Sequence, residues 1–599
     1  MFHGGGHGIR GGFDRDEVLG KVYDSKVISR LPRYMAPVRM WISLGAIGMV
    51  IRSLSALTIP YLMAQAVDKY ILVGNLDGLN TVAILSIGAA LLVWVGQYMQ
   101  TLFLSYAGQS ILFRMRTEMF NHLHRLSMSF FDQSIVGRLM SRVQNDVSQL
   151  QQLVTSEILN LITSALTLLM IASVMIFMNA QLALLTLTVV PVLATVIIIW
   201  QKFARRAFIK VRQAISAVNA RLQEGISGVR VTQSLSREEK SFEEFDNVNQ
   251  AHFGANIDAV RLQALMAPAV QILNGMAFAL VLVFGGYKVL TGEMGPGVLI
   301  AFLLYVQSFF RPVFELTMMY TELQRAMASG ARIFELLDIK PEINDSTEAV
   351  EMPLIKGKIT FNELSFSYQP DVEILHNINL TVNPGETVAI VGRTGAGKSS
   401  LTNLITRFYE VTDGKITVDD YDVRDVTQQS LRRQIGIVPQ DAFLFSGSME
   451  DNIKYGHPEA NHDDVVRAAK MVGIHDFVSR LEDGYSMSVG ERGGNLSAGQ
   501  RQLICLARAI LPNPPILILD EATSNVDTNT EHIIQESLQR LAKGRTCLII
   551  AHRLSTVTGA DRIVVLEQGN IVEEGSHRAL VAKRGVYYSM LQSLNAPEM

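Results

Sequence analysis

Six long apolar runs with few charged residues occupy roughly the first 320 residues of this 599-residue chain. Each run approaches or exceeds the roughly 20 residues that an α-helix needs to cross about 30 Å of hydrocarbon. We therefore predict that this region lies in a membrane as a helical bundle, because lipid leaves no partner for unpaired backbone groups. The predicted spans lie near 40–66, 81–107, 156–178, 182–203, 265–287 and 297–320.

The connections between these spans alternate in length and charge. Three of them are short and contain only Lys69 and Lys288 as basic residues, whereas the connections 108–155 and 204–264 are long and rich in Lys and Arg. Basic loops stay on the cytoplasmic side of a membrane. We therefore expect a multi-pass protein of the cytoplasmic membrane whose long loops and both termini are cytoplasmic. Helical periodicity continues beyond the second and fourth spans, which predicts helices that project past the bilayer.

One arginine, Arg52, lies inside the first predicted span. A charge at the bilayer centre costs about 2.5–3.5 kcal/mol, so the residue needs an explanation. A ligand or gating contact in a water-filled cavity would provide one. An arginine paired with another helix, or shifted toward the interface, would provide another, and the sequence leaves both open.

From about residue 340 onward, charged and apolar residues alternate as in a globular α/β domain. We expect an N-terminal cytoplasmic tail over 1–37, a membrane domain over 38–325, a linker over 326–355 and a nucleotide-binding domain over 356–599. The net charge of −3 and the dispersed basic residues argue against a nucleic-acid partner. Cys505 and Cys547 both lie in apolar runs, which favours buried thiols over a disulfide or a zinc site.

A glycine-rich loop, GRTGAGKS, follows the strand-like segment ETVAIVG and opens a helix. In this context glycines let backbone N–H groups approach phosphates, Lys398 reaches the β and γ oxygens, and the Ser399 hydroxyl binds Mg²⁺. A buried strand, ILILD, ends at Asp520, where a carboxylate can hold the same metal ion. Glu521 follows as the candidate general base that activates water. These residues predict a site for ATP and Mg²⁺.

A second possible phosphate site lies about a hundred residues later, where LSAGQ precedes the helix-like run RQLICLARAI. Unpaired N–H groups and the positive end of the helix dipole make such an N-terminus suitable for an anion. The chain already has one phosphate loop, so this motif raises the question of which phosphate it holds.

Seven motifs then occur in the order and spacing of an ABC transporter ATPase domain, and the chain resembles a half-transporter of the bacterial multidrug and lipid exporter class. The motifs are Tyr368, GRTGAGKS, Gln440 in GIVPQDAFLF, LSAGQ, ILILDE, SNVD at 524–527 and His552 in IIAHRL. The resemblance implies a membrane all-α region of six transmembrane helices with long cytoplasmic extensions, fused to an α/β P-loop ABC ATPase domain. The cytoplasmic loops at 130–147 and 224–249 resemble the same class, and short helices near 132–137 and 228–233 would transmit motion between the two halves.

The resemblance also implies a role for each matching residue. Glu521, His552 and Gln440 would be catalytic, Tyr368 would stack on adenine, and Ser524 and Asp527 would form the loop that communicates across a dimer interface. Ser399, Gln440 and Asp520 would hold Mg²⁺. The residues implied in binding ATP are Tyr368, Gly392, Arg393, Thr394, Gly395, Ala396, Gly397, Lys398, Ser399 and Ser400.

In this family the LSAGQ motif binds the γ-phosphate held by the other subunit, so Leu496, Ser497, Ala498, Gly499 and Gln500 would act in trans. Ala498 stands where many relatives have glycine. A chain with six spans and one ATPase domain would therefore need a second half-transporter. The segment SNVDT and the tail IVEEGSHRALVAKRGVYY resemble the fully equipped subunit of heterodimeric bacterial exporters, which favours a heterodimer slightly over a homodimer.

The resemblance implies ATP-driven export of amphipathic small molecules or lipids by alternating access. An ATP-gated channel or regulator on the same scaffold, or a peptide exporter, would be the alternatives. The intact Glu521, Gln440 and His552 favour sustained ATP turnover and hence a pump. The sequence does not identify the substrate.

Overall fold

A computed structural model describes residues 24–369, 371–520, 528–551 and 557–595, and these residues form two compact units. The first unit is made from Met1–His124 and Gly137–Ile339, and the second from Arg125–Val136 and Lys340–Met599. A short piece of the first long connection between spans thus belongs to the second unit.

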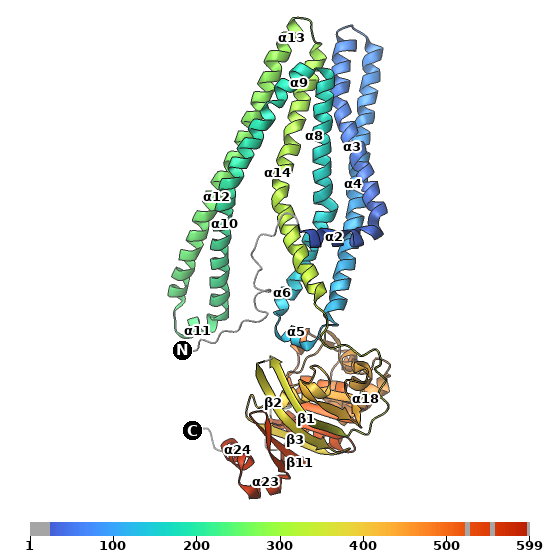
Figure 1. Cartoon of the computed structure of the whole chain (residues 1–599), viewed down its shortest axis with the longest axis vertical. Helices are drawn as coiled ribbons and strands as arrows, with labels where there is room; N and C mark the ends of the chain where they lie inside the picture. Colours follow the sequence, from blue (N-terminus) through green and yellow to red (C-terminus); the bar gives the residue numbers. More distant parts are fainter. Residues whose placement is uncertain (1–23, 370, 521–527, 552–556, 596–599) are drawn as a thin grey trace. The chain divides into compact units, whose positions relative to one another are not determined.

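The first unit is helical and contains all six predicted spans (Figure 1). Six of its helical stretches are long and apolar enough to cross a membrane, which confirms the prediction. Its helix α4 alone has 48 residues, or about 72 Å at 1.5 Å per residue, which is more than twice the hydrocarbon thickness. The helices are α2 (Ser25–Met35), α3 (Arg39–Gln65), α4 (Leu76–Leu123), α6 (Val136–Ser141), α7 (Val147–Gln152), α8 (Ile158–Met178), α9 (Ala180–Leu187), α10 (Val189–Ser227), α11 (Val229–Ser234), α12 (Glu238–Leu280), α13 (Gly286–Leu290) and α14 (Pro296–Asp338).

Small residues bring α3 and α4 close together. A Cβ atom added at Gly48 would lie 2.8 Å from the carbonyl oxygen of Gly96, and one added at Gly96 would lie 2.7 Å from the backbone nitrogen of Arg52. Lipid tails provide no hydrophobic force between helices, so close packing of this kind is what holds membrane helices together.

Helices α3 and α14 run antiparallel in a register that two polar contacts fix. Near one end, the Asp68 carboxylate accepts hydrogen bonds from the N–H groups of Gly297 (2.6 Å) and Val298 (3.1 Å) at the start of α14. Further along, the Tyr305 hydroxyl donates to the carbonyl oxygen of Leu57 at 2.7 Å. Residues that precede Leu57 on α3 therefore lie level with residues that come after Tyr305 on α14.

Helix α14 continues past residue 325, where the sequence analysis ended the membrane domain, and ends at Asp338. A buried contact explains the extension, because Ser329 Oγ (2.8 Å) and Arg332 Nε (2.9 Å) both donate to the Asp146 carboxylate. The pair ties this part of α14 to the π-helical turn Arg142–Asp146.

The second unit has the predicted α/β fold, with two main sheets and a small two-stranded sheet of β7 and β8 (Figure 1). The antiparallel sheet has the order β2-β1-β4-β5, and the larger sheet has the order β12-β11-β3-β10-β9-β6, in which only β12 is antiparallel to its neighbour. The strands are β1 (Ile359–Gln369), β2 (Val372–Val382), β3 (Thr387–Gly392), β4 (Asp413–Val418), β5 (Tyr421–Asp422), β6 (Ile435–Val438), β7 (Gly447–Ser448), β8 (Ser488–Val489), β9 (Ile516–Asp520), β10 (Thr546–Ile550), β11 (Arg562–Glu567) and β12 (Asn570–Gly575). The helices of this unit are α5 (Met128–Asp132), α15 (Lys398–Ile405), α16 (Gln428–Arg432), α17 (Met449–Lys454), α18 (His462–Met471), α19 (His475–Val478), α20 (Ala498–Ile510), α21 (Thr528–Ala542), α23 (His577–Lys583) and α24 (Val586–Asn595).

The larger sheet separates two hydrophobic cores. Successive side chains of a strand point to opposite faces, and accordingly Ala389 and Val391 of β3 join one core while Val388 and Ile390 join the other. The first core contains α20, and the second contains α15 and the antiparallel sheet. Central strands that read as continuous apolar runs are typical of a parallel sheet covered on both faces.

Candidate functional site

The phosphate loop connects the end of β3 at Gly392 to the start of α15 at Lys398. Gly395 (φ +83°) and Gly397 (φ +98°) are in the left-handed region, which glycine adopts without strain. A Cβ atom at Gly397 would lie 2.6 Å from Leu375 Cδ2, whereas one at Gly395 would meet no atom within 4 Å. The loop therefore packs on one side and presents open backbone on the other, as a phosphate cradle requires.

Lys398 lies within this loop and is only 6% exposed. Its Nζ atom donates hydrogen bonds to the carbonyl oxygens of Gly392 (2.8 Å) and Arg393 (3.1 Å). A buried ammonium group and the N-terminus of α15 thus meet in one small volume. This donor set fits a polyphosphate, because both contributions favour negative charge.

Tyr368 reaches the same loop from β1. Its hydroxyl donates to Ser400 Oγ at 3.0 Å, and its ring packs edge-on against Phe366 and Tyr409. The Tyr368 side chain remains partly exposed, so an aromatic surface is available beside the loop. The predicted stacking position therefore lies next to the predicted phosphate site.

The other candidate metal ligands lie at the same edge of the parallel sheet. Asp520 ends β9 and pairs in register with Ile550, which pairs in turn with Ile390 of β3. Gln440 is exposed and follows β6 by two residues. Because the carboxyl ends of parallel strands form one edge, these groups gather where α/β proteins bind ligands. Four predicted residues, namely Glu521, Ser524, Asp527 and His552, lie outside the residues that the structure describes.

The LSAGQ motif forms the capped start of α20. Ser497 Oγ accepts the backbone N–H of Gln500 (3.2 Å), and Gln500 Oε1 accepts the backbone N–H of Ser497 (2.9 Å). This capping box uses the third N–H group of the helix and leaves the first two at the N-terminus for an anion. The sequence analysis overlooked the box, although Ser followed three residues later by Gln is its usual signature.

Helix α20 also holds the segment 439–452, which contains Gln440. Gln502 Nε2 donates to the carbonyl oxygen of Pro439 (3.3 Å), and Arg508 NH1 donates to that of Phe443 (3.0 Å). Arg508 Nε donates further to the carbonyl oxygen of Asn452 (2.8 Å). The sequence analysis missed both side chains, because only the folded chain brings α20 against the segment 439–452.

A further contact joins the first long connection between spans to the candidate nucleotide site. Helix α5 ends at Asp132, whose carboxylate accepts a hydrogen bond from the Tyr409 hydroxyl, and the Tyr409 ring lies 5.0 Å from that of Tyr368. Burial and the Asp132 carboxylate raise the pKa of Tyr409, so the hydroxyl keeps its proton. A continuous set of contacts therefore runs from Ser400 to α5. The short helix predicted near 132–137 instead occupies 128–132, and the non-helical residues 133–135 separate it from α6.

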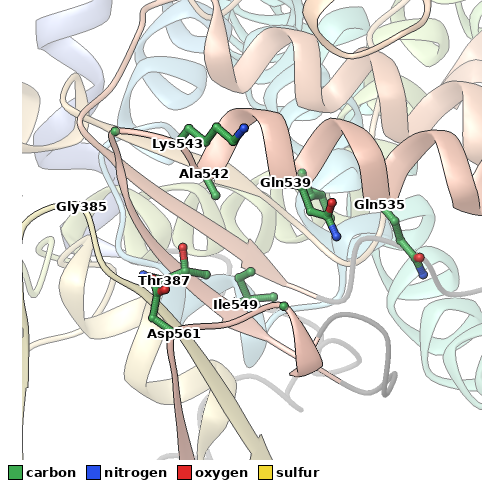
Figure 2. Close-up of a pocket in the computed structure, with 11 residues that line it drawn as sticks. Gly385, Thr387, Gln535, Gln539, Ala542, Lys543, Ile549 and Asp561 are labelled. Carbon is green, nitrogen blue, oxygen red and sulfur yellow. Dashed lines mark hydrogen bonds between the residues drawn. The ribbon is translucent and has the colours of Figure 1, made fainter. Parts of the chain in front are cut away.

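A separate cavity of about 270 Å³ lies at the opposite end of β3 (Figure 2). Thr387, Gln539, Lys543 and Asp561 are among its lining residues. Since Thr387 begins β3 and the phosphate loop follows Gly392 at its other end, this cavity is distinct from the candidate nucleotide site.

Comparisons with known proteins agree with this geometry. Residues 42–313 match the family model of the ABC transporter transmembrane region, and residues 375–524 match the family model described as ABC transporter. The chain belongs to the ABC transporter family. It is an ATP-hydrolysing membrane transporter of the exporter type, with an ATP-binding domain in its second half.

Three similar proteins align with this chain over most of its length. An ATP-dependent lipid A-core flippase of Syntrophus aciditrophicus is 38% identical over 566 residues, covering 94% of each chain. A fatty acid ABC transporter ATP-binding/permease protein of Mycobacterium bovis is 40% identical over 509 residues, covering 85% of this chain and 80% of its own. A solved bacterial Atm1-family ABC exporter with ATP bound has a TM-score of 0.73 and 29% identity, covering 95% of this chain and all of its own.

Proposed function

We propose that this chain is one half of a dimeric exporter that uses ATP to move amphipathic small molecules or lipids out of the cytoplasm by alternating access. The proposed organisation is that of the sequence analysis, with a cytoplasmic tail, a six-span membrane domain, a linker and a nucleotide-binding domain. The termini and the ATPase domain would lie in the cytoplasm. Relatives that handle lipid A-core and fatty acids support a lipid-like substrate.

The observation that carries the dimer is the separation of the two phosphate-binding elements within one chain. Ala396 and Leu401, at the phosphate loop, are anchored in one hydrophobic core. Leu496 and Leu503, at the LSAGQ motif, are anchored in the core on the other face of the sheet. Two anion-binding helix starts with separate anchors fit a site that closes when each element meets its counterpart on a second chain.

Each proposed hydrolytic site combines residues at the phosphate loop and the strand ends of one chain with the LSAGQ motif of the other chain. Ser399, Gln440 and Asp520 would hold Mg²⁺, which neutralises charge on the β and γ phosphates. Glu521 would accept the proton of the attacking water, and His552 would hold the γ-phosphate. Ser524 and Asp527 would communicate with the partner, and Ser497, Ala498 and Gly499 would contact the partner's γ-phosphate.

Closure of the dimer would reach the membrane helices through two short cytoplasmic helices. In the second unit, Asp132 of α5 is bonded to Tyr409, which packs on Tyr368 beside the phosphate loop. In the first unit, α11 exposes apolar side chains, including Val229 (48% exposed) and Val231 (62% exposed). Exposed apolar groups on a cytoplasmic helix fit a contact with a partner subunit.

We favour a related half-transporter over an identical copy as the partner. The support is the resemblance of SNVDT and of the C-terminal tail to the fully equipped subunit of heterodimeric exporters. Mass measurement of the purified complex, with its subunits separated, distinguishes the two. One mass would contradict the heterodimer.

Reconstitution of the complex in proteoliposomes tests the export function. We expect fluorescent lipid to move between leaflets only with hydrolysable ATP and Mg²⁺, and the movement to stop in the Glu521→Gln variant. An ionic conductance without ATP turnover would contradict a pump and support a channel on the same scaffold.

A further inference from the structure

Three charged residues stand apart from all others in the membrane unit. Of the charged residues in the six predicted spans, Glu157 and Lys202 lie at span ends, which leaves Arg52, Arg311 and Glu315 in the interior. Interior charges of this kind are costly, and they mark functional sites by default.

The structure brings these three residues together with two neutral ones. Arg52 NH1 on α3 donates to Gln97 Oε1 on α4 at 2.6 Å. On α14, Arg311 Nε donates to Glu315 Oε1 at 3.0 Å, and Glu315 Oε2 accepts the Ser164 hydroxyl of α8 at 2.9 Å. Helices α3 and α14 pack against each other, and the Tyr305–Leu57 hydrogen bond sets their register. We call these five residues the intramembrane polar cluster.

The two arginines of the cluster lie near the middle of the predicted spans 40–66 and 297–320. Arg52 is midway along α3, about 20 Å from either end at 1.5 Å per residue. The antiparallel register set by Leu57 and Tyr305 puts Arg311 at the same level of α14. Neither arginine can therefore reach the headgroup region by extending its side chain.

The charges of the cluster do not balance. Two guanidinium groups face one carboxylate, which leaves a net charge of +1. The Arg311 side chain is 85% exposed and the Glu315 side chain is 45% exposed in this chain. Because charges in a membrane protein face the bundle interior or a water-filled cavity rather than lipid, we expect these two side chains to face a water-filled space in the assembled transporter. An identical second copy would add the same net positive charge and could not neutralise it.

We propose that the intramembrane polar cluster binds the single negative charge of an amphipathic substrate, a carboxylate or phosphate headgroup that carries an acyl chain. Arg311 and Arg52 donate hydrogen bonds to the headgroup, and Glu315 orients Arg311. The apolar span of α4 around Gln97, free of charge from 81 to 107, accommodates the chain. This inference rests on the proposed export function and names its substrate class.

Oleate is a suitable probe, with the assembled complex in nanodiscs of zwitterionic lipid. We expect oleate to bind without ATP and to stimulate ATPase activity, and lysophosphatidylcholine and oleylamine to do neither at equal concentration. Arg311→Gln and Arg52→Gln should each raise the dissociation constant of oleate about tenfold or more, the scale of a hydrogen bond between charged groups. Arg311→Lys should keep most of the affinity.

Glu315→Gln provides the sharpest test because it removes the negative charge. We expect this variant to bind oleate more tightly, whereas a purely structural role for the ion pair would weaken binding in both Glu315→Gln and Arg311→Gln. Arg261→Gln is the matched control, since Arg261 is an exposed arginine of α12 paired with Asp258. Its affinity for oleate should equal that of the unaltered complex.

Separate readouts distinguish the site from the pump. ATP-driven lipid movement with oleate binding that ignores Arg52 and Arg311 would overturn the site and leave the export function standing. Oleate binding that depends on Arg311 in a complex that hydrolyses no ATP would support the site and contradict the exporter. Acetate or inorganic phosphate that binds as tightly as oleate would show that the ligand is a free anion, and would overturn a lipid-like substrate.

Discussion

The two units of this chain differ in how they accommodate positive charge. In the ATPase unit, the ammonium group of Lys398 has two carbonyl partners at hydrogen-bonding distance, and the side chain lies beneath a loop that a bound anion can complete. In the membrane unit, Arg52 donates to the neutral amide of Gln97. The neighbouring pair of Arg311 and Glu315 is neutral overall, so the three charged residues together carry one net positive charge. The first arrangement fits one specific kind of ligand, a polyphosphate. The second fits ligands that differ in shape but carry the same negative charge.

The packing of the two units differs for a related reason. Both faces of the larger ATPase sheet are buried, whereas the membrane unit leaves side chains such as Trp94 (66%) and Phe177 (88%) exposed. Lipid solvates those apolar groups, so helix association depends on close backbone approach instead. A substitution in the ATPase unit should therefore act mainly by removing a specific contact. A substitution in the membrane unit should act mainly by changing how closely the helices can pack.

The largest expected effect is on hydrolysis. Glu521→Gln should lower ATP turnover by about 100-fold or more while ATP still binds, because a positioned base contributes that much. Turnover and equilibrium binding of a fluorescent ATP analogue are the measurements. Glu536→Gln, an exposed glutamate on α21, is the control. Turnover near normal in the Glu521 variant would remove this residue from the role of base.

Nucleotide affinity should change next. Lys398→Ala removes a buried ammonium group from the phosphate loop and should weaken binding of ATP with Mg²⁺ by about 10- to 100-fold, the scale of charged hydrogen bonds. Lys415→Ala, at an exposed position of β4, should bind normally. Unchanged affinity in the Lys398 variant would count against the phosphate-loop assignment.

The close packing of α3 on α4 gives the matching test in the membrane unit. Gly48→Ala puts a methyl group 2.8 Å from backbone atoms of α4 and should destabilise the unit by about 1–3 kcal/mol. Thermal unfolding of the complex in detergent measures the change. Gly275→Ala on α12, where no atom lies within 4 Å, is the control. Equal melting temperatures for the two variants would show that α3 and α4 do not depend on close approach.

A smaller effect is expected at the contact between α5 and the ATPase domain. Tyr409→Phe keeps the ring against Tyr368 but removes the hydrogen bond to Asp132, and should lower transport per ATP hydrolysed by about two- to tenfold. ATP affinity should stay the same. Asp132→Asn retains an acceptor and should be milder than Asp132→Ala, while Tyr421→Phe should have no effect. A normal coupling ratio in Tyr409→Phe would exclude this hydrogen bond from transmission.

The smallest expected effect concerns the two thiols. Burial raises the pKa of Cys547 to about 12 and also raises that of Cys505, so neither forms appreciable thiolate at pH 8. Iodoacetamide reacts with the thiolate. We therefore expect no labelling of the folded complex at pH 8 and labelling of both residues in urea, as measured by mass spectrometry. Fast labelling of the folded protein would contradict their burial.

Much of this molecule could be predicted from local sequence. The six spans, the phosphate loop and the strand ending at Asp520 each depend on a short pattern, and the structure has each of them. Tyr409 and Arg508 could not be predicted, because their partners Asp132 and Asn452 are distant in sequence or belong to another element. The capping box of Ser497 and Gln500 could have been predicted from the spacing of the two residues. For Arg52, the sequence indicated the energetic cost of a charge in a membrane span but not which residues lie next to it.

The central claim is that one chain holds two halves of different hydrolytic sites. ATP turnover per chain, measured in nanodiscs that contain either one chain or the assembled pair, tests it most directly. We predict that turnover per competent site is close to zero for the single chain and appears only with the pair. Full turnover by a chain verified as single would contradict the account.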